Sequence, residues 1–216
     1  MTPTEYQKLA ERTSATATNQ GCEDVVNRMG DREVRLLHGA MGLCTEVGEL
    51  FENLIAQVVS GGPPDLTNIV EELGDGYWYA AEIYNALDLE MPTPVITPRG
   101  DITVFDNVYD LFRLATIAGS VQDALKRTLF YGAPLNVDLI ENMTAEFILL
   151  SAKILLGEGI SVESVMEKNI AKLQARFPDK FDSDKALNRD LAAERAELEK
   201  EVSTHTPIDP LGIDSE

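Results

Sequence analysis

The chain has 216 residues, of which 44% are apolar, so it can bury a core as one sizeable domain or two small ones. Its 37 acidic and 18 basic residues give a formal net charge of −19. This charge argues against a nucleic-acid polymer as partner, because binding to a phosphate backbone requires a basic surface. A small phosphorylated ligand remains compatible, since a divalent cation can bridge acidic side chains and phosphate.

Cysteine content and polarity predict a location for the protein. Cys22 and Cys44 are too few for a disulfide framework or a zinc cluster, and they fit a reducing compartment. The polar start, MTPTEYQKLAERTSATATNQ, lacks the apolar core of a signal peptide. The longest nearly apolar stretch, residues 145–156, contains Lys153 and is too short to cross a bilayer. We therefore expect a soluble, cytoplasmic protein with no membrane partner.

Apolar residues recur at helical spacing along nearly the whole chain, so the predicted fold class is all-α, a helical bundle. The segments between the predicted helices are rich in Pro, Gly and Asp. In chain order, we expect helices over residues 4–19, 31–58, 66–88, 104–130, 136–156, 161–176 and 184–202. Residues 1–181 should form a single domain, 182–203 a charged C-terminal helix and 204–216 a solvated acidic tail.

The bundle is predicted to contain two helical hairpin units as pseudo-repeats, residues 31–90 and 104–158. The stretch LCTEVGELFENL (43–54) overlays IAGSVQDALKRT (117–128), and a turn containing Gly and Pro follows each. Two unrelated helical hairpins would also overlay in this way, so duplication is a hypothesis. In the overlay, four acids of the first unit fall in order on Ser120, Asp123, Asn142 and Ala145. The second unit would then be a degenerate copy that kept mainly its packing.

Those four acids form two pairs, each with its members three residues apart. Glu46 and Glu49 belong to the predicted helix 31–58, and Glu72 and Asp75 to the helix 66–88. At roughly 100° per residue, each pair falls on one helix face beside the apolar side. Folding of the hairpin can therefore bring the pairs together. The alternative is two solvated faces, because exposed like-charge neighbours cost only about 0.2–0.5 kcal/mol.

Grouped acids need something to offset their repulsion. Without a cation, burial and mutual repulsion would raise their pKa values. Ligands that are all oxygen favour Mg²⁺ or Mn²⁺, so Glu46, Glu49, Glu72 and Asp75 are the predicted metal ligands. Gly39 and Gly42 lie on the same stripe and cost the helix about 1 kcal/mol each. We interpret them as space for a group that approaches this face closely.

The pattern E-x-x-E, then E-x-x-D after residues 50–71, resembles that of the MazG-like all-α nucleoside triphosphate pyrophosphatases of phage and bacterial type. EYQKLAERT (5–13) is similar to the first helix of that superfamily, and residues 159–181 are similar to its last. The tandem layout with a degenerate second copy also resembles the related dimeric dUTPases. It departs from the usual unit, in which the last helix directly follows the acid helices.

The resemblance implies a metal-dependent pyrophosphohydrolase that cleaves a (d)NTP to (d)NMP and pyrophosphate. Its cofactor would be Mg²⁺ or Mn²⁺, its partner a nucleoside triphosphate and its assembly a homodimer. Among the catalytic acids, Glu49 would accept the proton of the attacking water. A deoxynucleotide such as dGTP in a phage nucleotide pathway is one expected substrate. The alternatives are a dUTPase or dCTPase, a phosphoribosyl-ATP pyrophosphohydrolase, a non-catalytic nucleotide-binding protein and a purely structural bundle.

The resemblance also implies a set of substrate contacts. Phosphates would meet basic and amide groups of the last helix, with a contribution from the second copy, and an aromatic side chain would stack on the base. Each of these residues has an ordinary alternative as a solvated or packed helix position. The expected substrate-binding residues are His38, Asn53, Tyr79, Lys126, Arg127, Asn169, Lys172 and Arg176.

Overall fold

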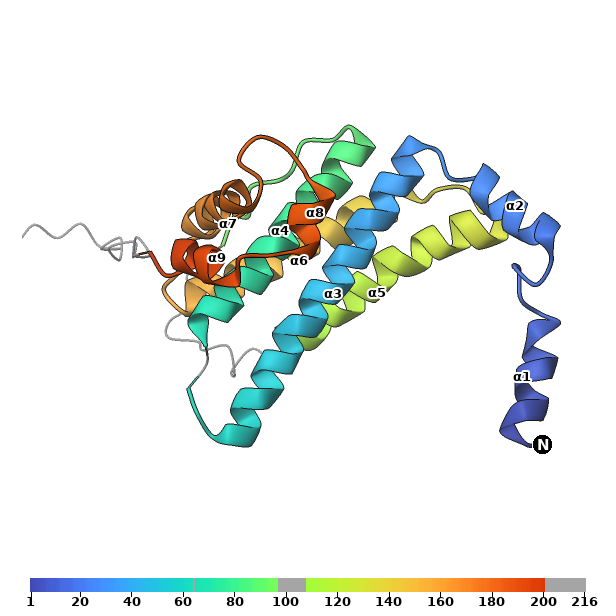
Figure 1. Ribbon diagram of the computed structural model, residues 1–216, viewed down its shortest axis with the longest axis horizontal. Coiled ribbons are helices and arrows are strands. Elements are labelled where there is room, and N and C mark those ends of the chain that lie inside the picture. The colour runs from blue at the N-terminus through green and yellow to red at the C-terminus, as the bar shows by residue number, and fades with distance from the viewer. Residues whose placement is uncertain (64, 97–107, 201–216) are drawn as a thin grey trace, which may run out of the picture.

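The structure is a computed structural model that describes residues 1–63, 65–96 and 108–200. Over these ranges every regular element is a helix, so the predicted all-α fold class is confirmed (Figure 1). None of these helices is long and apolar enough to cross a membrane. The first four residues of the predicted helix 104–130 and the predicted tail 204–216 lie outside the described ranges.

Helices α3 (Asp31–Ser60) and α4 (Leu66–Leu87) form a hairpin. Helix α3 ends where Gly61 adopts a left-handed conformation with φ of 69°, which glycine tolerates without steric cost. Helix α4 begins where the side chain of Asp65 accepts a hydrogen bond from the backbone N–H of Asn68. Local signals thus set both ends of the turn, and the two helices pack along their lengths.

A second hairpin, α5 (Val108–Tyr131) and α6 (Val137–Gly157), packs on the first. Helix α5 lies against α3, and α6 lies against α4 (Figure 1). The four helices share one apolar core. Among its fully buried side chains are Leu36, Leu43, Leu50, Ile69, Leu73, Ile83, Leu114, Ile117, Leu125 and Phe147. Two packed hairpins suit the proposed pseudo-repeats, although duplication itself stays a hypothesis.

The C-terminal part folds back over the first hairpin. Helix α7 (Val162–Arg176) packs on α4 and α6, and α9 (Leu191–Leu198) packs on α7 and α4. The predicted continuous helix 184–202 is wrong, because the chain forms α8 (Ser183–Leu187) and then starts a new helix. Asp190 explains the break, since its side chain caps α9 by accepting from the N–H of Ala193 at 3.0 Å.

The predicted helix 4–19 is wrong beyond residue 11. The structure has α1 (Pro3–Glu11) and then α2 (Asn19–Asn27), which the sequence interpretation missed. Thr18 caps α2 by accepting from the N–H of Gly21 at 3.1 Å, and this side chain competes with a continuous helix. Helix α2 packs on α5, whereas α1 has no buried residue and lies apart from the bundle (Figure 1).

Candidate functional site

Three of the four predicted acids meet where α3 faces α4. One carboxylate oxygen each from Glu46, Glu49 and Glu72 lie within 4.8 Å of one another. Glu46 and Glu72 are buried, with 9% and 5% of their surface exposed, whereas Glu49 is exposed. We call these three residues the acid cluster. Helical spacing explains why Glu46 and Glu49 share a face, and the hairpin turn brings Glu72 to them.

The acid cluster holds its carboxylates in an unfavourable environment. Burial, reinforced by the charges of Asp75, Glu49 and Glu72, raises the pKa of Glu46 to about 8. Burial and the charges of Glu49 and Glu71 raise the pKa of Glu72 to about 7. One hydrogen bond compensates in part, since Asn68 Nδ2 donates to Glu72 Oε1 at 2.8 Å. The cluster therefore gains from any cation that neutralises it.

The composition of the acid cluster fits a hard divalent cation. Its donors are all carboxylate oxygens, which Mg²⁺ and Mn²⁺ prefer. Beside it lies an open hollow of about 650 Å³, which Glu49 and Glu72 line together with Asn53 and Asn68. Asn53 accepts a hydrogen bond from Gln57 Nε2 at 2.7 Å, which orients its carboxamide. The arrangement can hold a cation with room for a ligand next to it.

The fourth predicted acid, Asp75, accepts hydrogen bonds from two residues of α7. Lys172 Nζ lies 2.7 Å and 2.6 Å from its two carboxylate oxygens, and Asn169 Nδ2 donates to it at 2.5 Å. Lys172 is fully buried, so its ammonium group is closed to solvent in this conformation. Asp75 nonetheless raises the pKa of Glu46 by charge repulsion. It therefore links the acid cluster to α7 without joining the cluster.

Arg176, expected to face phosphate, is paired with a carboxylate. Its Nε donates to Glu194 Oε1 of α9 at 2.9 Å, and its Nη2 bonds the other carboxylate oxygen. Arg189 donates to the same Glu194 through Nε at 3.1 Å and Nη2 at 2.7 Å. Sequence reasoning missed Glu194 and Arg189. Only the break before α9 brings them to α7, and the cap signal of Asp190 was the available clue.

An aromatic group lies beside Asp75. The ring of His38 makes edge contacts with those of Trp78 and Tyr79, at centroid distances of 5.8 Å and 5.5 Å. These three side chains border a second hollow, of about 220 Å³. Its remaining lining residues are Asp75, Leu173, Arg176, Phe177, Phe181 and Ala186. Two of the predicted substrate-binding residues, His38 and Tyr79, thus lie together.

Gly39 and Gly42 of α3 allow α4 to pack closely against this helix. A Cβ at Gly42 would lie 2.2 Å from the Tyr79 ring, and one at Gly39 would lie 2.6 Å from Ile83 Cγ1. The groups that approach closely are therefore side chains of α4. The expectation that a group approaches this face closely is confirmed, and packing of α4 on α3 supplies that group.

Replacement of Gly42 by Ala is expected to lower the free energy of unfolding by about 1–3 kcal/mol, since the Tyr79 ring must shift. Gly48→Ala is the matched control on the same helix. No atom lies within 4 Å of a Cβ there, so this change should stabilise the protein by about 0.5–1 kcal/mol. Urea unfolding measures both. Equal stabilisation by the two substitutions would contradict the close contact with Tyr79.

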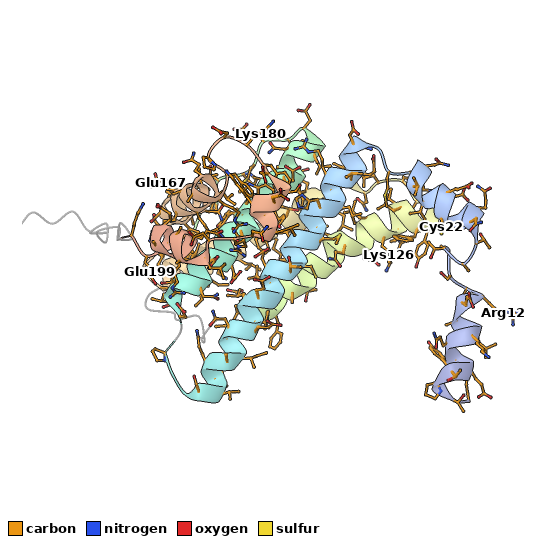
Figure 2. All side chains as sticks on the ribbon, in the orientation of Figure 1. Arg12, Cys22, Lys126, Glu167, Lys180 and Glu199 are labelled. Atoms are coloured by element: carbon orange, nitrogen blue, oxygen red, sulfur yellow. The ribbon has the colours of Figure 1, made fainter. Side chains whose placement is uncertain are left out.

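Lys126 and Arg127, expected to reach phosphate from α5, lie elsewhere. Lys126 pairs with Asp123 on the same helix, and both side chains are about half exposed. Figure 2 shows Lys126 near Cys22 of α2, across the helical bundle from Glu199, which follows α9. Arg127 lines a separate hollow with Pro134 and Asn136. The structure therefore does not bring either residue to the hollow beside the acid cluster.

Fold and site together define an all-α bundle with an acidic hollow between two helices. Comparison of the chain with protein-family models, with curated proteins and with solved structures finds no match.

Proposed function

We propose that this protein is a metal-dependent nucleoside triphosphate pyrophosphohydrolase, which cleaves a (d)NTP to (d)NMP and pyrophosphate. The observation that carries the proposal is the acid cluster, in which two helices bring together three carboxylate oxygens within 4.8 Å. The sequence resemblance suggests the reaction class, and the acid cluster is the place where we propose that the reaction occurs. dGTP is the substrate we would examine first.

The residues of the proposed site would hold the metal, accept a proton and orient a neighbouring side chain. Glu46, Glu49 and Glu72 would hold Mg²⁺ or Mn²⁺, which when bound supplies neutralisation of phosphate charge and acidification of water. Glu49 is the exposed member and would accept the proton of the attacking water. Lys172 is too deeply buried to meet phosphate in this conformation, so its task would be to orient Asp75.

The substrate would lie across the two hollows. Asn53 lines the one beside the acid cluster, and Tyr79 and His38 border the other, where a flat base can stack on aromatic rings. As part of the proposal, the protein acts in the cytoplasm as a homodimer. The exposed apolar side chains Val58 and Val59 near the end of α3 support a face that a second chain covers.

Replacement of Glu49 by Gln is expected to abolish turnover, because the amide cannot accept a proton and is a poorer metal ligand. The assay incubates the protein with each common NTP and dNTP, including dUTP, with Mg²⁺ or Mn²⁺, and separates products by ion-pair chromatography. Glu167→Gln, an exposed position on α7, is the control and should retain full activity. The loss from Glu49→Gln should be at least about 10²-fold.

The assay also separates the alternatives. Hydrolysis restricted to dUTP or dCTP would favour the dUTPase or dCTPase reading over dGTP. Turnover that survives Glu49→Gln would remove the acid cluster from the reaction. No turnover with any nucleotide and either metal would contradict the proposal and leave a nucleotide-binding or structural role.

A further inference from the structure

A buried carboxylate on α9 forms ion pairs with two arginines. Glu194 is almost fully buried and accepts hydrogen bonds from both Arg176 and Arg189. Arg176 bonds both of its oxygens, so this pair is bidentate. Planar guanidinium groups bind phosphate oxygens with the same forked geometry. We call Arg176 and Arg189 the two-arginine cradle, and its occupant in the free protein is the side chain of Glu194.

The cradle is continuous with the proposed site. Arg176 lines the aromatic hollow together with Asp75 and Tyr79. Arg189 Nη2 lies 3.5 Å from Glu71 Oε1, and Lys172 Nζ lies 3.4 Å from the same oxygen. A chain of charges therefore leads from the Asp75–Lys172 pair to the cradle. A polyphosphate bound at the acid cluster would have a basic place for its distal end along this path.

Charge rather than apolar burial holds α9 and its flanks in place. Helix α8 buries no residue, and of α9 only Glu194 and Leu198 are buried. Leu187 and Leu191 are 82% and 63% exposed. Leu198 belongs to the apolar core, and the polar attachments of α9 include the hydrogen bond of Lys168 Nζ to the Leu198 carbonyl and the pair of Arg195 with Asp65 at 3.6 Å. Movement of α9 would therefore expose one buried apolar side chain of this helix, that of Leu198.

We propose that the two-arginine cradle is a binding site for the terminal phosphates of a polyphosphate, and that Glu194 is an internal competitor for it. Phosphate entry would displace the Glu194 carboxylate and release α9, while Arg189 keeps its contact with Glu71. Helix α9 is then an autoinhibitory strap that opens as ligand binds. The inference rests on the proposed function for the identity of the anion, and it adds Arg189 to the residues that meet substrate.

Binding of inorganic triphosphate tests the cradle without any hydrolysis. Isothermal titration calorimetry at low ionic strength, with and without Mg²⁺, compares the wild-type protein with Glu194→Gln. Removal of the competing charge should tighten triphosphate binding about tenfold, since charge-assisted bonds to arginine no longer have to be broken. Glu199→Gln removes the same charge from an exposed pair with Arg195 and should change the Kd by less than about twofold.

A second substitution separates a competitor from a simple structural tether. Arg189→Gln should weaken triphosphate binding about tenfold in the wild-type protein and cancel the gain in the Glu194→Gln background. Circular dichroism verifies that each variant is folded, and Arg189→Gln alone decides if Glu194→Gln does not fold. If Glu194 only tethers α9, Glu194→Gln will not tighten binding and Arg189→Gln will leave it unchanged. Either result overturns the inference.

The outcomes of this experiment and of the turnover assay are separable. Tighter binding of triphosphate by Glu194→Gln without turnover of any nucleotide would keep the cradle and contradict the pyrophosphohydrolase. Nucleotide turnover with the same triphosphate affinity in wild type and Glu194→Gln would keep the enzyme and overturn the strap.

Discussion

Replacement of Asp75 by Asn is expected to lower the free energy of unfolding by about 3 kcal/mol, because it leaves a buried ammonium group without its main counter-charge. Lys172 has no exposed surface, and both oxygens of Asp75 lie within 2.7 Å of its Nζ. Its other carboxylate partner, Glu71, is more distant, at 3.4 Å. Urea unfolding at pH 7, followed by circular dichroism, measures the loss.

A second ion pair supplies the matched control for Asp75→Asn. Asp110 is buried and pairs with Lys153 at 2.5 Å, but the Lys153 side chain is 35% exposed. Asp110→Asn should therefore cost less, about 1 kcal/mol, because water can solvate the released ammonium group. In the double variant Asp75→Asn with Lys172→Met, most of the lost stability should return. Equal losses of stability for Asp75→Asn and Asp110→Asn would show that burial of Lys172 does not increase the contribution of its ion pair to the free energy of unfolding.

The parts of the fold that follow from local chemistry were predictable from the sequence. Apolar spacing located α3 and α4, and the Gly61 turn and Asp65 cap fixed their junction. The same chemistry explains why the prediction of one helix over 4–19 was wrong, since Thr18 caps the start of a separate helix, α2. That signal was present in the run of Ser and Thr before it. Periodicity alone extends a helix through such a cap, because it does not weigh side-chain bonds to the backbone.

The site was predictable only as far as one hairpin determines it. Glu46 and Glu49 share a helix face by geometry, and the short turn brings Glu72 opposite them. The contact of Asp75 with Lys172 joins residues 97 positions apart, and no local pattern specifies it. Gly42 illustrates the same limit. A gap on a helix face is visible in the sequence, but only the packed structure shows that the Tyr79 ring fills it.

Replacement of Glu46 by Gln is expected to raise the free energy of unfolding at pH 8, in metal-free buffer, by about 2 kcal/mol. The substitution keeps the shape of the side chain and removes a buried carboxylate that Glu49 and Glu72 repel. Glu52→Gln, at an exposed position on the same helix, removes an equal charge and should change stability by less than about 0.5 kcal/mol. Urea unfolding in the presence of a chelator measures both variants.

The expected gain depends on pH in a definite direction. The pKa of Glu46 rises from 4.5 to about 8 on folding, and that of Glu72 rises to about 7. The folded state therefore binds more protons than the unfolded state between these values. The contribution of the two carboxyl groups to stability is complete below about pH 4.5 and is lost as the pH rises through about 7 to 8. Glu46→Gln should flatten this decline, so its advantage over wild type should shrink as the pH falls toward 5.

Added Mg²⁺ or Mn²⁺ should reverse the order of the two proteins at pH 8. A cation on the acid cluster would stabilise the wild type by about 2.7 kcal/mol at a concentration 100 times its Kd. Glu46→Gln lacks one charged ligand and should gain much less, so the repulsion that weakens the metal-free protein is the same feature that favours the metal-bound one. Equal metal stabilisation of both proteins would mean that cations bind elsewhere on this acidic chain. A loss of metal-free stability in Glu46→Gln at pH 8 would mean that the carboxylate is held by bonds stronger than the repulsion.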